Sequence, residues 1–168
     1  MHLPSTNVLI QVIIVGVLTG GVYALMAAGL TLIFGVMRVI NIAHGAFLIF
    51  SAYLSYWLFS IYGLDPFLSV IVTVPLLFVI GIVFQQHLLA RVRNEPGLMV
   101  LLTFSLAITL EGVMGALWQT TGRSVRTWYT SEVWKVELAE LTLRLPVIRV
   151  AGFVAAVIAL FLLYLLMT

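Results

Sequence analysis

The sequence predicts an all-α polytopic membrane protein with about five transmembrane helices and a long external loop. Hydrophobic residues make up 63% of the 168 residues and charged residues only 8%. A typical globular domain is roughly 45–50% apolar and about 25% charged. A soluble fold of this length has too little interior to bury so much apolar surface. The lipid bilayer is therefore the solvent that suits this composition.

Five segments approach the roughly 20 apolar residues that a helix needs to cross a bilayer. They are residues 8–34, 46–61, 67–84, 98–118 and 150–168. We expect these spans to form a single membrane domain over residues 1–168. Pro75 lies inside the third segment and should bend that helix, because its ring removes a backbone hydrogen bond.

The breaks between these segments carry turn residues and charges. Residues 62–66 read Tyr-Gly-Leu-Asp-Pro, which favours a tight turn between two helices. The longest break, residues 120–149, holds more than half of the charged residues. Inside it, apolar residues recur mostly at every second position, which is the period of a half-buried strand: Val136, Leu138, Leu141, Leu143 and Leu145. We predict a β-hairpin that turns near Ala139-Glu140; the alternative is an amphipathic helix at the membrane surface.

Positive charges in short loops predict the orientation. Arg91 and Arg93 lie in a short loop, which the positive-inside rule assigns to the cytoplasm. Alternation then places residues 120–149 outside, where a long loop is translocated largely regardless of its charge. The N-terminus would lie outside and the C-terminus inside. This orientation also gathers the tryptophans near the outer interface, as an aromatic belt requires: Trp57, Trp118, Trp128 and Trp134.

Several kinds of chemistry find no support in the sequence. The chain has no cysteine, which excludes disulfides and thiolate metal sites. Its single lysine, Lys135, follows no glycine-rich run, so a P-loop for ATP is excluded. The basic residues are scattered between apolar segments, as in membrane loops, and do not indicate nucleic-acid binding. We therefore expect no enzyme activity, no cofactor and no metal site.

The first segment carries small residues at four-residue spacing. These are Gly16, Gly20, Ala24 and Ala28. Such a stripe lets two helix backbones approach closely in lipid, where packing drives association. Packing inside one subunit is the favoured interpretation, and a face between two subunits is the alternative.

Polar residues in or beside the spans are candidates for a translocation pathway. Asn41, His44 and Gly45 lie where a long hydrophobic stretch is interrupted. Irregular backbone at membrane depth is tolerated only where it is buried in protein or lines a cavity. Glu111 is the one acid within a predicted span, where a carboxylate costs on the order of 3 kcal/mol. We expect Glu111 to face the protein interior; the alternative is a place near the outer interface, close to Trp118.

Two stretches resemble the inner-membrane permeases of branched-chain amino acid ABC importers. Residues 21–35 read Gly-Val-Tyr-Ala-Leu-Met-Ala-Ala-Gly-Leu-Thr-Leu-Ile-Phe-Gly, and residues 41–45 read Asn-Ile-Ala-His-Gly. They are similar to the family pattern G-x-x-Y-A-L-x-A-x-G-L-x-L-x-x-G followed by N-x-A-H-G. The second similar stretch is residues 102–112, Leu-Thr-Phe-Ser-Leu-Ala-Ile-Thr-Leu-Glu-Gly. The motif positions are matched by Tyr23, Asn41, Ala43, His44 and Gly45, and Glu111 lies in the second stretch. The chain departs from the family at Ser105 and Gln119, where glycine is common.

The resemblance implies a permease subunit of an ATP-driven importer for branched-chain amino acids or related small polar solutes. Such a subunit lies in the bacterial inner membrane and works with a second permease subunit, ABC ATPase subunits and an external substrate-binding protein. Family members continue past the fifth span into a cytoplasmic coupling segment, so we expect this chain to be a fragment or a truncated product. The alternatives are a channel or secondary transporter, or a permease fragment without function.

The predicted orientation can be tested in this cysteine-free chain with single-cysteine variants. We expect Ser131→Cys to react with an impermeant maleimide in intact cells, because residues 120–149 are predicted to lie outside. Asn94→Cys should react only after the cells are permeabilised. Labelling of Asn94→Cys alone from outside would show that the orientation is inverted.

Overall fold

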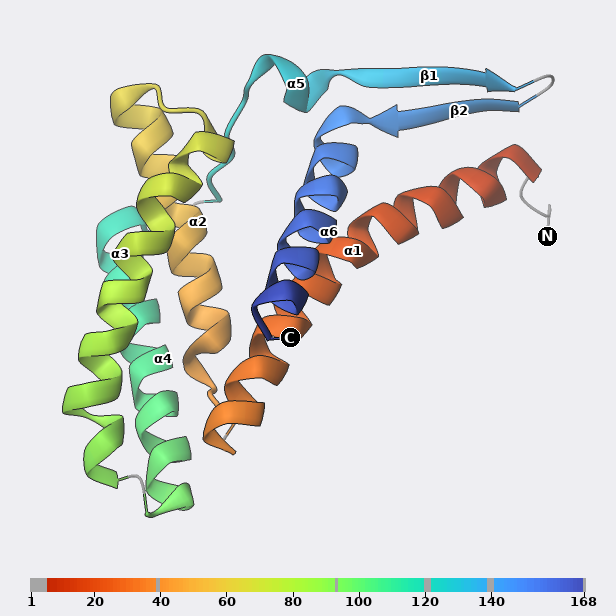
Figure 1. Cartoon of the computed structure of the whole chain (residues 1–168). Helices are drawn as coiled ribbons and strands as arrows, with labels where there is room; N and C mark the ends of the chain where they lie inside the picture. Colours follow the sequence, from red (N-terminus) through yellow and green to blue (C-terminus); the bar gives the residue numbers. More distant parts are fainter. Residues whose placement is uncertain (1–5, 39, 93, 120–121, 139–140, 168) are drawn as a thin grey trace, which may run out of the picture. The chain divides into compact units, whose positions relative to one another are not determined.

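The computed structural model describes residues 6–38, 40–92, 94–119, 122–138 and 141–167 (Figure 1). Arg93, the predicted turn at Ala139-Glu140 and Thr168 lie outside the described residues. The elements in chain order are α1 (Thr6–Met37), α2 (Ala43–Tyr62), α3 (Pro66–His87), the 3₁₀ helix η1 (Leu89–Val92), α4 (Pro96–Trp118), α5 (Trp128–Ser131), β1 (Val133–Leu138), β2 (Leu141–Pro146) and α6 (Val147–Met167).

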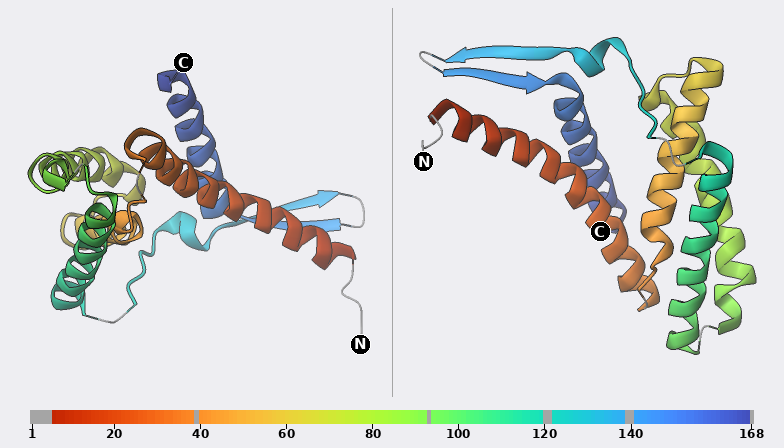
Figure 2. Two further views of the ribbon diagram at one scale, coloured as in Figure 1. Left: turned by 90° about the horizontal axis from the view of Figure 1, so that it is seen from below. Right: turned by 180° about the vertical axis from the view of Figure 1, so that it is seen from behind.

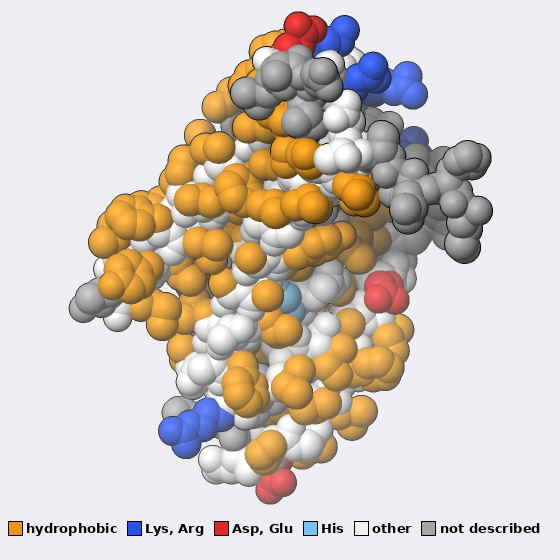
Figure 3. All heavy atoms as spheres, turned by 90° about the vertical axis from the view of Figure 1, so that its right-hand side faces the viewer, with side chains coloured by type: hydrophobic (Ala, Val, Ile, Leu, Met, Phe, Trp, Pro, Cys, Tyr) orange, Lys and Arg blue, Asp and Glu red, His pale blue; other side chains and the backbone are white. Residues whose placement is uncertain are grey.

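The long helices carry apolar side chains on their outer surfaces. Within the described part of the chain, five helical segments are long and apolar enough to cross a membrane: α1, α2, α3 continued through η1, α4 and α6. Ile71 and Phe78 in α3, for example, are 71% and 67% exposed. Hydrophobic side chains cover most of the face shown in Figure 3. The predicted fold class, a mainly helical chain with five long apolar helices, is confirmed.

The long loop between α4 and α6 holds the predicted β-hairpin. β1 and β2 pair antiparallel, with Trp134 opposite Leu145 and Val136 opposite Leu143. Because side chains alternate between the two faces of a strand, these four residues share one face, and Lys135 and Arg144 share the other. The hairpin prediction is confirmed, and the alternative of an amphipathic helix is wrong.

The contacts divide the chain into two compact units, residues 1–31 with 126–168 and residues 32–125. In the second unit, α2 contacts both α3 and α4 (Figures 1 and 2). Between α2 and α3, the hydroxyls of Ser55 and Ser69 lie 2.5 Å apart. Ser69 is 1% exposed, so this polar pair is enclosed by the helices.

An aromatic cluster joins the middle and second half of α2 to the end of α4 within the second unit. The Trp118 ring stacks on Tyr53 with centroids 5.0 Å apart and meets Trp57 edge-on at 5.2 Å. Phe50 makes a further edge contact with Trp118 at 6.2 Å. Trp118 is only 3% exposed. Edge-on and offset ring pairs of this kind add about 0.5–1.5 kcal/mol each beyond their buried area.

The first unit joins α1, as far as Thr31, to the hairpin and α6. The Gln11 side chain bonds to both backbone groups of Arg144 in β2, accepting from its N–H at 2.8 Å and donating to its carbonyl. The Arg149 guanidinium donates to the Thr19 hydroxyl at 3.2 Å. An ideal Cβ built on Gly21 would lie 2.4 Å from the Phe153 ring. Gly21 is therefore the position where α1 admits a large side chain of α6.

Two helices of the second unit, α2 and α4, are followed by a residue with positive φ. Gly63 ends α2 with φ 66°, and its amide bonds to the Phe59 carbonyl at 2.9 Å, which is the 5→1 bond of an αL helix cap. Asp65 then caps α3 by accepting from the Phe67 amide at 2.9 Å. Gln119, directly after α4, has φ 62° and ψ −174°. That region is essentially reserved for glycine and costs other residues on the order of 1–3 kcal/mol.

Replacing Gln119 by glycine should stabilise the second unit. We expect Gln119→Gly to raise the free energy of unfolding by about 1 kcal/mol, because relief of strain exceeds the added chain entropy of glycine. Thermal unfolding of the purified chain in detergent measures the change. Gln119→Ala is the matched control, since it shortens the side chain but keeps the strained backbone. If the glycine variant is no more stable than the alanine variant, the backbone at Gln119 is not strained.

Candidate functional site: the break between α1 and α2

The hydrophobic stretch that begins with α1 is broken at residues 38–42. α1 ends at Met37, and Arg38 follows with φ 55°. Its amide donates to the Phe34 carbonyl at 2.7 Å, which closes the last turn of the helix. A left-handed residue is a common helix terminator, but the position normally belongs to glycine. Arg38 therefore ends α1 in a strained conformation that an arginine rarely adopts.

Two side chains satisfy the backbone amides where α2 begins. The Asn41 Oδ1 accepts from the Ala43 amide at 3.1 Å, and the Asn41 carbonyl accepts from the His44 amide at 3.2 Å. The Ile42 amide donates to the Thr103 Oγ1 of α4 at 3.3 Å. These bonds matter because the first amides of a helix have no partner within the helix.

Thr103 places the break beside the interior of α4 rather than beside its end. It lies seven residues after Pro96, the first residue of α4, and a helix rises about 1.5 Å per residue. The bond to Ile42 is therefore about 10 Å along α4 from the start of that span. Thr103 is 2% exposed, and Ala43, Ala46 and Ala107 form a buried cluster beside it. The small side chains allow α2 and α4 to approach closely.

The predicted site residues do not all lie at this break. Asn41 is half-buried within it, whereas His44, half-buried, and Gly45, exposed, belong to the first turn of α2. Tyr23 is 65% exposed in α1 and belongs to the other compact unit. Glu111 is exposed on α4, eight residues beyond Thr103. That Glu111 faces protein stays a prediction for the assembled transporter.

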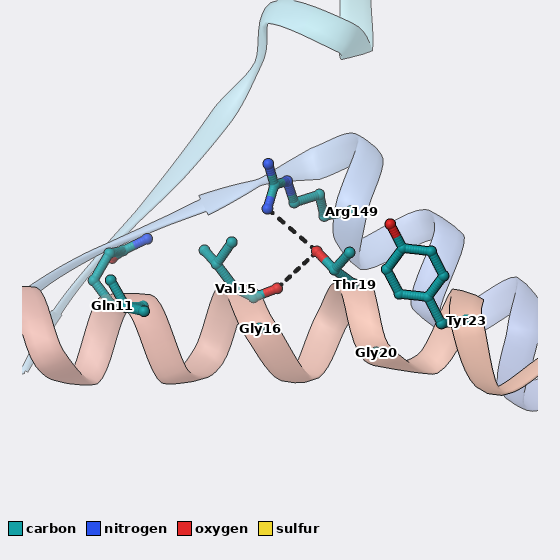
Figure 4. A pocket seen from close by; sticks show the side chains of 8 residues that line it. Gln11, Val15, Gly16, Thr19, Gly20, Tyr23 and Arg149 are labelled. Carbon is teal, nitrogen blue, oxygen red and sulfur yellow. Dashed lines mark hydrogen bonds between the residues drawn. The ribbon is translucent and has the colours of Figure 1, made fainter.

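The predicted packing stripe is open in the described chain. Gly16, Gly20 and Ala24 are exposed and Ala28 is half-buried. A Cβ added at Gly16 or Gly20 would meet nothing within 4 Å among the described residues. The two glycines instead line a hollow of about 580 Å³ that also includes Gln11, Tyr23 and Arg149 (Figure 4). The close approach is made at Gly21, on a different face of α1.

Sequence reasoning missed the residues that join distant segments. Thr103, Gln11 and Arg149 each make a hydrogen bond across more than 60 residues of sequence. The only signal at Thr103 was its polar side chain within an apolar run. Among the residues that the structure describes, no three His, Cys, Asp or Glu residues are grouped as a metal site requires.

Comparison with known proteins identifies the family. The family described as the permease component of branched-chain amino acid transport systems matches residues 12–168. The chain belongs to this family. It is therefore a multi-pass membrane protein, and five of its described helices are long and apolar enough to be the membrane spans.

One curated relative is the "Probable branched-chain amino acid transport permease protein LivH" of the archaeon Methanocaldococcus jannaschii. It is 33% identical over 98 residues, which cover 55% of this chain and 30% of the relative. The chain thus matches less than a third of that relative's length. No solved structure matches the chain.

The bond between Thr103 and Ile42 should stabilise the start of α2. We expect Thr103→Val, which keeps the shape and removes the hydroxyl, to lower the free energy of unfolding by about 0.6–2 kcal/mol. Thr109→Val is the matched control, because the Thr109 hydroxyl bonds only within α4, to the Ser105 carbonyl. Unfolding in detergent compares the two variants. Equal destabilisation by both would show that the bond to Ile42 contributes nothing measurable.

Proposed function

We propose that the chain forms part of the translocation pathway of an ATP-driven importer for branched-chain amino acids or related small polar solutes. Both compact units would belong to one membrane domain, in the inner (plasma) membrane of a bacterial cell. The observation that carries this proposal is the capped break between α1 and α2, which lies beside the interior of α4. Family membership supports the substrate class.

The break supports a pathway because non-helical backbone is not tolerated in contact with lipid. Hydrocarbon offers no hydrogen bonds, so non-helical backbone within a span must be buried in protein or line a polar cavity. In transporters, discontinuous helices place their ends at the substrate site. Here the ends of α1 and α2 meet at residues 38–42, beside the polar side chains of Arg38, Asn41 and His44. These three side chains, with Gly45, are the pathway residues that we propose at this end of α2.

The energy for transport would come from other subunits. The single lysine, Lys135, follows no glycine-rich run and lies in β1, whereas a P-loop joins a strand to a helix. We therefore propose that ABC ATPase subunits hydrolyse ATP, that a second permease subunit completes the pathway, and that an external substrate-binding protein delivers the solute. The permease itself would do no covalent chemistry. Tyr23 and Glu111 remain further candidates for pathway contacts.

Uptake by the assembled transporter tests this function. Vesicles would contain the permease with its cognate ATPase and second permease subunit, with the binding protein added outside and ATP enclosed. We expect leucine uptake that requires both ATP and the binding protein. Because loss of a capping hydrogen bond costs about 1 kcal/mol, Asn41→Ala should lower uptake about fivefold. His44→Ala should also lower leucine uptake.

Matched control variants distinguish a specific effect at the break from a general loss of stability or expression. Asn94→Ala and His87→Ala make the same substitutions outside the break, and we expect near-normal uptake from both. Uptake that needs no ATP would instead identify a channel or secondary transporter. Full uptake by both Asn41→Ala and His44→Ala would show that the break is not part of the translocation pathway.

A further inference from the structure

A small hollow lies further along α2, in the same compact unit as the break. It has a volume of about 190 Å³ and is lined by Ile49, Ala52, Tyr53, Tyr56 and Arg123. The four α2 residues follow the spacing i, i+3, i+4, i+7, so they form one face of the helix. Gly45, four residues before Ile49, continues this face down to the break. A Cβ at Gly45 would meet nothing within 4 Å among the described residues, so the face stays open there.

Arg123 brings a positive charge to this hollow. Its guanidinium donates to the Trp118 carbonyl at 3.4 Å, and its Cζ lies 5.9 Å from the centroid of the Tyr56 ring. The Tyr56 hydroxyl also interacts with Ser60 and Arg123. These partners are neutral, and among the described residues no carboxylate forms an ion pair with Arg123. A guanidinium has five N–H donors, so most of them remain available to a ligand.

Most of the α2 side chains that line the hollow are apolar or aromatic. Ile49 and Ala52 supply aliphatic surface, and the Tyr53 ring is held by stacking on Trp118 with centroids 5.0 Å apart. Trp118 is itself clamped by the edge contacts of Phe50 and Trp57. The hollow therefore combines a fixed apolar surface with one cation and one phenol. Few polar groups on an apolar wall are the usual composition of a small-molecule site.

We propose that this hollow is a subsite for the carboxylate of an apolar amino acid. The Arg123 fork would bind the carboxylate in a bidentate manner, and the Tyr56 hydroxyl would donate a further hydrogen bond. Ile49, Ala52 and Tyr53 would contact the aliphatic side chain. The inference rests on the proposed function for the substrate class, and the predicted orientation places the subsite at the outer mouth of the pathway.

Ligand competition on the unmutated chain tests the chemistry directly. The 168-residue chain in lipid nanodiscs is incubated with radiolabelled L-leucine and three competitors. We expect 4-methylpentanoate, which lacks the amino group, to compete. Isopentylamine, which lacks the carboxylate, and inorganic phosphate, which lacks the aliphatic part, should not compete. Absent saturable leucine binding, or competition by the amine equal to that by the acid, would overturn the proposal.

Substitutions then locate the binding. We expect Arg123→Gln to weaken leucine binding about 10- to 100-fold, because it removes the charged hydrogen bonds. Arg123→Lys should be intermediate, since it keeps the charge and loses the planar fork. Arg126→Gln is the matched control from the same loop and should bind normally. An equal loss with Arg126→Gln would overturn the assignment to Arg123.

Uptake separates failure of the subsite from failure of the proposed function. Normal leucine uptake by an assembled Arg123→Gln transporter at limiting leucine would overturn the subsite and leave the function standing. If the unmutated assembly shows no ATP-driven leucine uptake but the chain still binds the carboxylate through Arg123, the proposed function fails and the subsite stands.

Discussion

The start of α2 beside the interior of α4 depends on one hydrogen bond, from the Ile42 amide to the Thr103 hydroxyl. An amide left without a partner in hydrocarbon costs several kcal/mol, so a helix cannot simply begin inside a bilayer. Thr103 and Asn41 together remove this cost for the first amides of α2. As a result α2 begins beside the interior of α4 rather than beside its first residue.

Because α2 begins part-way along α4, its start also determines which residues of α2 contact the end of α4. The last residue of α4, Trp118, contacts Phe50, Tyr53 and Trp57, which lie in the middle and second half of α2. α2 therefore runs past the end of α4. Tyr56 is thereby brought level with the residues that follow α4, where Arg123 reaches it. The capped break and the hollow beside Arg123, which we propose as a carboxylate subsite, thus both follow from one offset between parallel helices.

Packing in this bundle uses small and polar side chains because lipid supplies no hydrophobic force between helices. The alanine cluster of Ala43, Ala46 and Ala107 permits close backbone approach between α2 and α4. On the other side of α2, the Ser69 hydroxyl donates to the Pro66 carbonyl at 2.6 Å, which leaves its oxygen to accept from Ser55. α2 is therefore held by different chemistry on its two sides.

The sequence predicted what depends on local composition and period. The five spans follow from apolar length, and the hairpin follows from two-residue alternation around Val136 and Leu143. The interruption near Asn41 was also visible, but α2 begins at Ala43, because the Asn41 side chain can accept from that amide. His44 and Gly45 consequently belong to a helical turn.

Contacts across the chain could not be predicted in the same way. Thr103 looks like an ordinary polar residue in an apolar run until its partner, 61 residues away, is placed beside it. The stripe through Gly16 and Gly20 stays a prediction for packing, whereas the contact of α6 with α1 at Gly21 was not predicted. Which face of an apolar helix is covered depends on its partner, and α1 is apolar on every side.

Strain in the backbone marks both polar regions of the second unit. Among the described residues, the two non-glycine positions with positive φ are Arg38 and Gln119, and each directly follows a membrane span. At Arg38, the cation lies at the negative end of the α1 dipole, which offsets part of the strain. At Gln119, where the family resemblance leads one to expect glycine, Arg123 caps the preceding Trp118 carbonyl. An observed outlier supports a hypothesis of local function. The strained position after α1 adjoins the break, and the one after α4 adjoins the arginine proposed to bind the carboxylate.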